Sequence, residues 1–259
     1  MKKLVKRLGS FGLTAIARVE SPTDRAFLAD DVPLTRFLRP RDLLSYLDST
    51  GRSGKPCVLE IGSREVTGVS TARQDYADAD YVGFDYYPGR NVDVVGDVHR
   101  LSSYFEPDRK FDLVFSFASF EHFAMPWIVA QEVAKIMSTG GILYIRTHFS
   151  FKAHERPWNF FQFSDMGLRV LFPSALGFEC LDAGMSNPIV GRFSGLAEKS
   201  LRYQPIRGLY CGSEYLGRKV RDVPSFDWNQ VKVEEVVEGT KYPAPKQESE
   251  VFAAGEIRV

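Results

Sequence analysis

The sequence contains few cysteines, and nothing in their spacing pairs them. Three of the 259 residues are cysteine, namely Cys57, Cys180 and Cys211. Their odd number and wide spacing exclude a disulfide framework and a cysteine-based zinc motif. Cys57 and Cys180 lie in apolar runs and are expected to be inert core residues. We therefore expect a reducing, cytoplasmic environment.

Net charge is also absent. The chain has 33 basic and 33 acidic residues, so its formal net charge is zero. Proteins that bind nucleic acids usually carry a basic excess, so no nucleic-acid partner is expected. The composition, with 44% hydrophobic and 25% charged residues, is typical of a globular protein. The length is sufficient for one large domain with a substantial core.

Long apolar runs are missing. No stretch reaches the ~18 residues that a membrane-spanning helix needs. The start of the chain carries Lys2, Lys3, Lys6 and Arg7 before a mildly apolar stretch, and it lacks the apolar core of a signal peptide. We expect a solvated segment here. The alternative is an amphipathic segment that makes weak contact with an anionic membrane surface or a lipid-linked substrate.

What the sequence does contain is an alternation of strand-like and helix-like stretches. Strands are predicted at residues 57–61, 80–85, 92–95, 111–117, 141–147, 177–185 and 250–259. Helices are predicted from about residue 39, at 68–77, at 126–137 and from Ser164, which suits a helix N-cap. Continuous apolar strands alternating with helices indicate an α/β fold, a mostly parallel sheet with helices on both faces.

Three regions are expected. Residues 1–50 form an N-terminal helical and basic segment, and residues 51–184 form the core of the fold. Residues 185–259 form an insertion or cap followed by the last strand of the sheet. The part at 185–247 has weak periodicity and many prolines and glycines. Because a structureless loop of this length is improbable in a compact domain, we expect an insertion with structure of its own over one end of the sheet. We expect this insertion to form part of the acceptor site or a contact between subunits of an oligomer.

Acidic residues follow the predicted strands. In an open α/β sheet, ligands bind at the carboxyl ends of the strands. Glu60 and Gly62 follow the first strand, Asp85 ends the second and Asp97 follows the third. Asp85 suits a ribose diol, and Asp97 with the N–H of Val98 suits adenine. Together they predict an adenosine pocket, although each acid alone could be a helix cap or a solvated turn.

The first loop decides which adenosine ligand fits. Between Gly62 and Gly68 the chain lacks the middle glycine of G-x-G-x-x-G, and Glu65 would face a diphosphate. The P-loop pattern is also missing. An NAD-dependent oxidoreductase is therefore the weaker alternative. A ligand without phosphates fits better, such as S-adenosylmethionine (SAM), whose ammonium group Glu60 would suit.

Five stretches together resemble the class I SAM-dependent methyltransferases. They are VLEIGSREVTG, YVGFD, VGDVHRL, FDLVFSFASFEHF and the helix–STGG–strand that follows. The resemblance covers about Lys55 to Gly184 and comes closest to the group that modifies sugars, glycans and small metabolites. It implies a Rossmann-like, seven-stranded sheet with one antiparallel strand and SAM as cofactor. The first loop departs from the family pattern, with Ser63, Arg64 and Glu65 where many members have glycines. The cofactor-binding residues that it implies are Glu60, Gly62, Ser63, Asp85, Tyr86, Asp97, Val98, Ser116 and Phe117.

Histidines are the candidates for the catalytic base, because methylation of a hydroxyl requires removal of a proton near neutral pH. His154, His148 and His122 follow the predicted fifth and fourth strands. No cluster has convincing metal-ligand spacing, so no metal is expected. The loop from His154 resembles one found in some glycan-type methyltransferases. Its aromatic residues would contact a sugar or a flat metabolite, or alternatively cap the core; they are Trp158, Phe160, Phe161 and Phe163.

The sequence thus predicts a SAM-dependent methyltransferase that methylates an oxygen atom of a sugar, glycan precursor or related small metabolite. One alternative is N- or O-methylation of another small metabolite. The other is a methyltransferase fold that has lost turnover and supports a partner protein. An oligomer is compatible with either.

Overall fold

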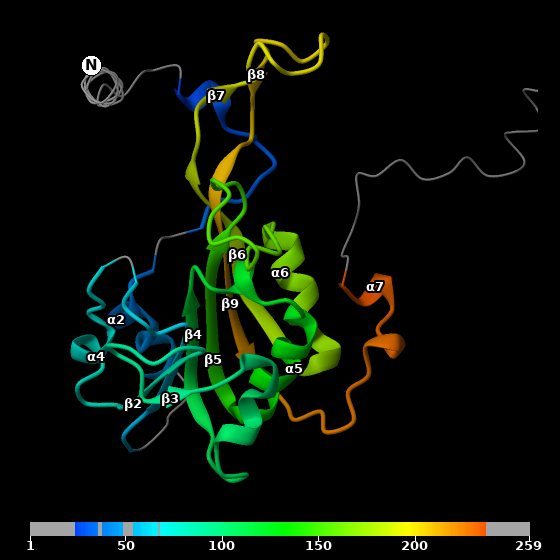
Figure 1. The fold of residues 1–259 in the computed structure, drawn as a ribbon. Coiled ribbons are helices and arrows are strands. Elements are labelled where there is room, and N and C mark those ends of the chain that lie inside the picture. The colour runs from blue at the N-terminus through cyan, green and yellow to red at the C-terminus, as the bar shows by residue number, and fades with distance from the viewer. Residues whose placement is uncertain (1–23, 36–37, 49–53, 67, 237–259) are drawn as a thin grey trace, which may run out of the picture. The chain divides into compact units, whose positions relative to one another are not determined.

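The computed structural model describes residues 24–35, 38–48, 54–66 and 68–236. The chain divides into two units, Met1–Phe226 and Asp227–Val259. In the first unit a seven-stranded sheet has the strand order β3-β2-β1-β4-β5-β9-β6 (Figure 1). Its strands are β1 (Cys57–Ile61), β2 (Asp80–Asp85), β3 (Val94–Val95), β4 (Phe111–Phe117), β5 (Met137–His148), β6 (Phe178–Pro188) and β9 (Tyr210–Lys219).

The sheet is mostly parallel. The pairs from β3 through β5 are all parallel, whereas β9 runs antiparallel to both of its neighbours, β5 and β6. The predicted α/β fold with a Rossmann-like, seven-stranded sheet is therefore confirmed. The central strands are apolar because both of their faces are covered: Val58 to Ile61 and Phe111 to Ser116 are all buried.

Helices lie on both faces of the sheet. The helices α2 (Pro40–Leu43) and α4 (Ala72–Asp75) lie on one side, and α5 (Pro126–Ile136) and α6 (Asp165–Leu171) lie on the other (Figure 1). The other helices in the described residues of this unit are α3 (Ser45–Asp48) and the 3-10 helices η1 (Asp24–Phe27), η2 (Val98–Tyr104), η3 (Phe120–His122) and η4 (Ser174–Leu176). The core contains Leu43 and Tyr76 from the helical side together with Val58, Leu113, Phe115, Ile142 and Tyr144 from the strands.

Several element ends follow the sequence prediction. Helix α5 begins at Pro126, and Ser164 caps α6 by accepting a hydrogen bond from the N–H of Gly167 at 3.0 Å. Two elements are shorter than predicted: α4 covers four residues, and β3 covers only Val94 and Val95. Strand β5 is longer, because it begins at Met137 directly after α5 and includes the STGG stretch.

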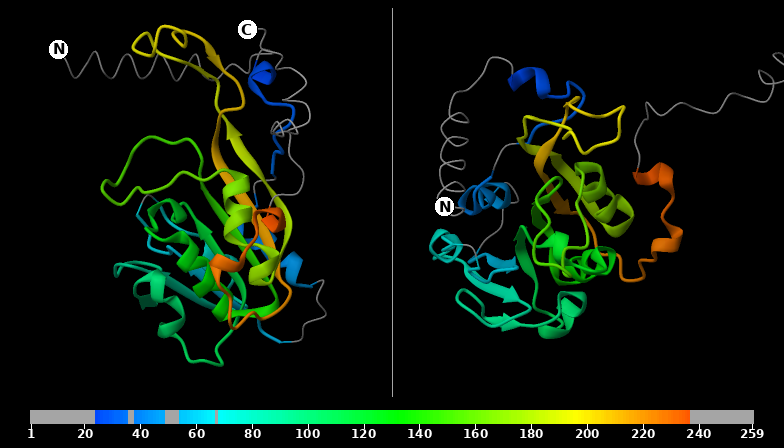
Figure 2. Two further views of the ribbon diagram at one scale, coloured as in Figure 1. Left: turned by 90° about the vertical axis from the view of Figure 1, so that its right-hand side faces the viewer. Right: turned by 45° about the horizontal axis from the view of Figure 1, so that its top comes forward.

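The seventh strand of the described sheet, β9, was not predicted from the sequence, and the strand predicted at residues 250–259 stays a prediction. Strand β9 lies inside the 185–247 stretch that was expected to be an insertion, while residues 250–259 lie outside the described part of the chain. The segment between β6 and β9 projects beyond the sheet, where β7 (Gly191–Arg192) pairs with β8 (Pro205–Ile206) (Figures 1 and 2). The 185–247 stretch therefore supplies an internal strand of the sheet as well as this projecting hairpin.

A buried lysine joins β9 to α5. Lys219 is 1% exposed, and its Nζ donates hydrogen bonds to the carbonyls of Ala134 at 2.7 Å and Met137 at 2.8 Å and to Asp222. A cation at the C-terminal end of a helix complements the partial negative charge there. The contact fixes the end of β9 against the point where α5 passes into β5.

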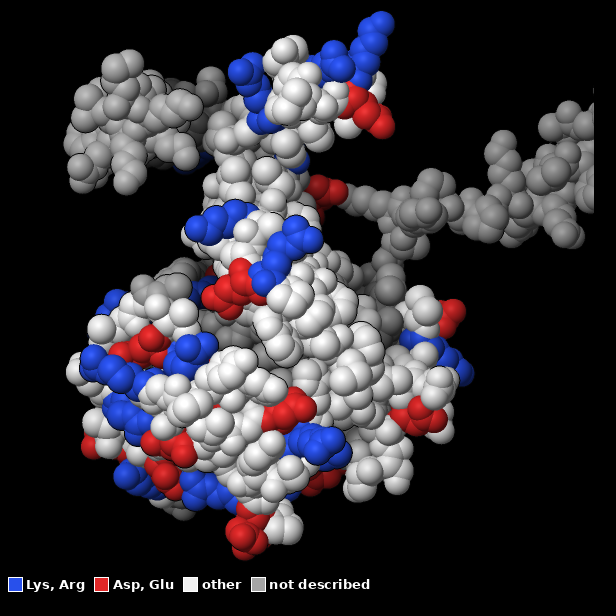
Figure 3. Space-filling model, viewed as in Figure 1, with Lys and Arg blue, Asp and Glu red and all other residues white. Residues whose placement is uncertain are grey.

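The described part of the second unit is short. It contains η5 (Trp228–Gln230), capped by Asp227, and α7 (Val233–Val236). Among the described residues, no helix combines the length and apolar character needed to cross a membrane. On the face of the molecule in Figure 3, basic and acidic side chains are intermixed, in keeping with the zero net charge.

Candidate functional site

Gly62 turns the chain at the end of β1. Its φ of +81° is a conformation that residues with a side chain rarely adopt. Its N–H donates to the carbonyl of Phe84 in β2 at 2.8 Å. A Cβ at this position would lie 2.0 Å from the Oγ of Ser119, which follows β4. Gly62 therefore allows the ends of β1, β2 and β4 to meet closely.

Glu60 is buried beneath this turn. The hydroxyl of Tyr81 donates a hydrogen bond to its Oε2, and the amide of Asn91 does so at 3.2 Å. Burial raises the pKa of Glu60 to about 7, although these hydrogen bonds oppose the shift. The amide of Asn91 also donates to the carbonyl of Ser63 at 3.0 Å. Glu60 and Asn91 thus hold the loop after β1 in place through the hydrogen bond from Asn91 to Ser63.

Asp85 ends β2 and contacts the same loop. Its carboxylate accepts hydrogen bonds from the backbone N–H of Arg64 at 3.2 Å, from the Nε of Arg64 at 3.3 Å and from the N–H of Tyr87 at 3.0 Å. Arg64 is one of the three residues that stand where many family members have glycines, and it is the partner of Asp85 in this structure. A carboxylate has about four acceptor positions, so capacity for a further donor remains.

Asp97 caps η2. Its Oδ1 accepts a hydrogen bond from the N–H of His99 at 3.0 Å and lies 2.6 Å from the Nδ1 of the His99 ring. Burial opposes ionisation, but the His99 contacts dominate and lower the pKa of Asp97. The Nε2 of His99 accepts from the N–H of Met125 at 3.2 Å. His99 thus links Asp97 to the segment before α5, and Val98 beside it is buried.

The two residues at the end of β4 use their side chains within the fold. The Oγ of Ser116 donates to the carbonyl of Ile61 at 2.9 Å and is buried. The guanidinium of Arg146 lies 4.3 Å from the centre of the Phe117 ring. Any contact of Ser116 with a ligand would therefore come from its backbone.

The aromatic loop after β5 returns over the strand ends. The N–H of Phe163 donates to the carbonyl of His148 at 2.8 Å, and the N–H of Phe160 donates to the carbonyl of Glu121 at 2.9 Å. These bonds place the half-exposed ring of Trp158 6.1 Å from the ring of Tyr86, the residue after Asp85. Within this loop, Phe163 is buried in the core whereas Trp158 and Phe160 are exposed.

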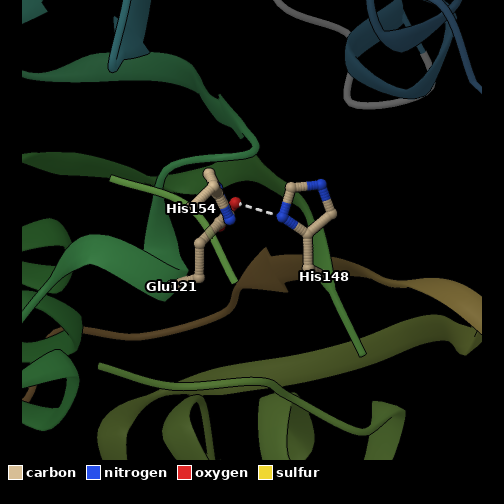
Figure 4. Close-up of side chains that lie close together, drawn as sticks. All are labelled: Glu121, His148 and His154. Atoms are coloured by element: carbon tan, nitrogen blue, oxygen red, sulfur yellow. Dashed lines mark ion pairs between the residues drawn. The ribbon is translucent and has the colours of Figure 1, made fainter. Parts of the chain in front are cut away.

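The three candidate histidines gather around Glu121, whose side chain is fully buried. Its Oε2 accepts a hydrogen bond from the hydroxyl of Thr147 at 2.5 Å, and its Oε1 lies 2.6 Å from the Nδ1 of His148 (Figure 4). Burial alone would raise the pKa of Glu121, but the contacts with His148 and Thr147 hold it below its usual value. The ring of His154 lies 5.4 Å from that of His148 and 5.0 Å from that of His122.

A family model described as a methyltransferase domain matches residues 32–178, more than half of the chain. The chain belongs to this methyltransferase family. The family implies a SAM-type cofactor. A comparison with curated proteins found no match.

Solved methyltransferase structures are among those that this methyltransferase resembles. The plantazolicin methyltransferase BamL, in complex with a triazolic desmethylPZN analog and S-adenosylhomocysteine (SAH), is 13% identical, with a TM-score of 0.48 over 70% of this chain and 83% of that chain. The [4+2]-cyclase SpnF is 16% identical, with a TM-score of 0.44 over 70% and 81%. TehB from Haemophilus influenzae is 14% identical, with a TM-score of 0.40 over 68% of this chain and 61% of that chain. The match thus covers less than two thirds of TehB.

In the methyltransferase, the residues predicted for the cofactor come from neighbouring strand ends. Glu60 lies in β1, and Gly62 and Ser63 follow that strand. Asp85 ends β2 and Tyr86 follows it, Ser116 and Phe117 end β4, and Asp97 caps η2, which begins at Val98 after β3. A hollow of about 650 Å³ lies elsewhere, beside the amino ends of β1 and β4, and contains none of them.

Sequence reasoning missed three residues of this site: Arg64, Asn91 and Glu121. Arg64 and Asn91 act through contacts across two loops, which spacing along the chain does not reveal. Glu121 carried a signal, since it directly precedes His122 in a segment that follows a buried strand.

Proposed function

We propose that this methyltransferase transfers a methyl group from SAM to a hydroxyl of a sugar, a glycan precursor or a related small metabolite, with a histidine as general base. The observation that carries the proposal is the course of the aromatic loop. It begins beside His148 and brings Trp158 next to Tyr86, so it spans the distance from the candidate bases to the predicted ribose end of the cofactor.

The cofactor would lie along the strand ends. Gly62 turns the chain at the end of β1, and no described group hydrogen-bonds the buried Oγ of Ser63 that follows it, so this hydroxyl has capacity for a ligand. Asp85 would accept from the ribose, Asp97 and Val98 would hold the adenine, and Glu60 would attract the ammonium group. SAM, when bound, supplies the electrophilic methyl group.

The acceptor would lie between the exposed rings and the histidines. Trp158 and Phe160 present aromatic faces on which the apolar face of a sugar can stack. The Nδ1 of His122 lies 2.9 Å from the carbonyl of Trp158, and the Nδ1 of His154 lies 3.0 Å from the carbonyl of Lys152. A ring that donates from Nδ1 has an Nε2 that can accept a proton, which suits a general base.

The first experiment tests the cofactor site by calorimetric titration of the full chain with SAH. We expect Asp85→Ala to weaken binding by roughly tenfold or more, because it removes a charged hydrogen-bond acceptor. Asp80→Ala is the matched control: Asp80 begins the same strand at its other end, where it pairs with Arg109. Equal losses of SAH affinity in both variants, or no SAH binding by the folded wild type, would overturn the cofactor assignment. Either result would favour the alternative of a methyltransferase fold that has lost turnover and supports a partner protein.

The second experiment tests the acceptor class with a labelled-methyl assay on free sugars, sugar nucleotides and small amines. Label on a sugar hydroxyl supports the proposal, and label only on an amine would favour the N-methylation alternative. Replacing the base should lower kcat by roughly 10²-fold or more while SAH affinity stays unchanged. The variants are His122→Gln, His148→Gln and His154→Gln. We further propose a cytoplasmic location, since none of the three cysteines forms a disulfide.

A further inference from the structure

Three side chains that end or follow β4 and β5 form the donor set of a metal site. Glu121, His148 and His154 each offer one ligand atom, and these atoms lie within 4.8 Å of one another (Figure 4). We propose that they bind one first-row divalent transition-metal ion, of the class to which zinc belongs. This goes beyond the proposed function, because metal binding requires neither cofactor nor acceptor.

The contact between Glu121 and His148 is the first argument. The Oε1 of Glu121 and the Nδ1 of His148 lie only 2.6 Å apart, which is within ion-pair distance. Nevertheless, within the described part of the chain neither buried atom has a hydrogen bond of normal geometry. The ring N–H therefore does not point at the carboxylate oxygen. A buried carboxylate oxygen and a buried imidazole nitrogen that lie together without a hydrogen-bond partner are donor atoms that a metal ion would satisfy, once they separate from 2.6 Å to the ~3.3 Å between ligands of one ion.

The orientation of the ligands by their neighbours is the second argument. Metal-binding histidines commonly donate their other ring N–H to a carbonyl, and metal-binding carboxylates are themselves hydrogen-bonded. The Nδ1 of His154 lies 3.0 Å from the carbonyl of Lys152, which leaves its Nε2 for a metal. The Oε2 of Glu121 is held by the hydroxyl of Thr147, which leaves its Oε1. The ring of His148 is fixed by stacking on Phe151 at 4.2 Å.

The donor types indicate the class of ion. Two imidazoles and one carboxylate suit zinc and its first-row neighbours, whereas magnesium and calcium prefer oxygen ligands alone. In a tetrahedral zinc site the ligand atoms lie about 3.3 Å apart, given bonds of about 2.0 Å. A spread of 4.8 Å therefore requires His154 to move inward by on the order of 1 Å, which its position on a loop allows.

Three protein ligands leave a fourth position open, as in catalytic zinc sites. An acceptor oxygen in that position would lie beside the aromatic loop. With His148 and His154 as ligands, His122 would be the ring that remains to take up a proton. Its Nε2 lies 4.0 Å from the Oε1 of Glu121.

The test uses the full chain after removal of metal with a chelator. Zinc is titrated by calorimetry into the wild type and three variants, and cobalt is then bound in its place to record the visible spectrum of the coordinated ion. We expect one equivalent of zinc to bind at micromolar concentration or tighter. His154→Ala and Glu121→Gln should each weaken binding by at least about tenfold. The control is His99→Gln, the fourth histidine, whose ring contacts Asp97 instead, and it should bind zinc as the wild type does.

His154 is the safer variant for folding because it lies on a loop, whereas Glu121 is fully buried. Thermal melting of each variant accompanies the titrations. The inference is overturned if the wild type binds no zinc, or if a folded His154→Ala binds it undiminished. Magnesium that competes equally with zinc would also overturn it. The outcome is separable from the cofactor assignment: SAH binding without zinc contradicts only the metal site, and zinc binding without SAH contradicts only the cofactor site.

Discussion

The α-carbon of Gly62 faces the hydroxyl of Ser119 so closely that a Cβ on the glycine would lie 2.0 Å from the serine Oγ. The contact joins the loop after β1 to the segment after β4. Both segments contribute to the proposed cofactor site, so their relative position is important for it. Because φ of Gly62 is also positive, a side chain there is unfavourable for two independent reasons.

We expect Gly62→Ala to lower the free energy of unfolding by roughly 2 kcal/mol and to weaken SAH binding, since the left-handed conformation and the overlap with Ser119 both disfavour a methyl group. Urea denaturation and calorimetry measure the two effects. Gly68→Ala is the control in the same loop, because a Cβ there meets open space. If both variants unfold at the same urea concentration, Gly62 has no special role.

Glu60 should make stability depend on pH. Its folded pKa of about 7 exceeds the ordinary value of 4.5, so between these values the folded state retains a proton that the unfolded state has released. Raising the pH through this window therefore lowers the free energy of unfolding, by on the order of 3 kcal/mol in total. Urea denaturation across the window should show this loss in the wild type and a flatter curve in Glu60→Gln. Parallel curves would contradict the raised pKa.

SAH binding should depend on the same proton. A ligand ammonium near Glu60 lowers the pKa of this carboxyl, so binding releases a proton and becomes tighter as the pH rises towards about 7, above which the affinity levels off. Calorimetry in buffers of different ionisation enthalpy measures the released proton directly. Glu60→Gln should remove both the release and the pH dependence. Proton release that persists in the variant would show that the ammonium lies elsewhere.

Lys219 should be important for stability, because it satisfies carbonyls at the buried end of α5. We expect Lys219→Met to lower the free energy of unfolding by about 2 kcal/mol, since it leaves those acceptors without donors. Lys199→Met is the control: Lys199 is exposed on the segment between β7 and β8, and its loss should change stability by less than about 0.5 kcal/mol. Equal denaturation midpoints for the two variants would contradict the role of Lys219.

Trp158 should contribute to binding of the acceptor and not to the rate of methyl transfer. Removing an exposed aromatic face costs about 1 kcal/mol of stacking, so Trp158→Ala should raise the acceptor KM roughly fivefold with little change in kcat. Trp158→Phe should restore most of the affinity. A loss confined to kcat would place this side chain at the reacting atoms instead.

The sequence predicted strands most reliably where the pattern of apolar residues was unambiguous. The run CVLEI forms β1 as predicted because the central strands are covered on both faces and must be apolar throughout. Strand β9 was missed for the opposite reason. It contains Glu214 and Lys219, which are buried only because Tyr144 and the carbonyls at the end of α5 pair with them. Those partners are distant in sequence, so strand propensity alone did not reveal them.

In the candidate site, too, some residues could be found from the sequence and others could not. Strand ends and their acids could be found from spacing, since parallel strands deliver their carboxyl ends to one edge. The grouping of Glu121 with His148 and His154 could not be found in this way, because their positions on different segments follow no ligand spacing. The pairing of β4 with β5 brings Glu121 next to His148, and the aromatic loop, which returns over Glu121, adds His154.

The internal position of β9 bears on how the chain can be divided. The family match ends at residue 178, where five of the strands are complete and neither β6 nor β9 has formed. A fragment that ends there would leave Ile142 to His148 of β5 without the antiparallel neighbour with which they pair. Unpaired edges of this kind recruit other chains, so such a fragment should aggregate although it retains every residue predicted to bind the cofactor.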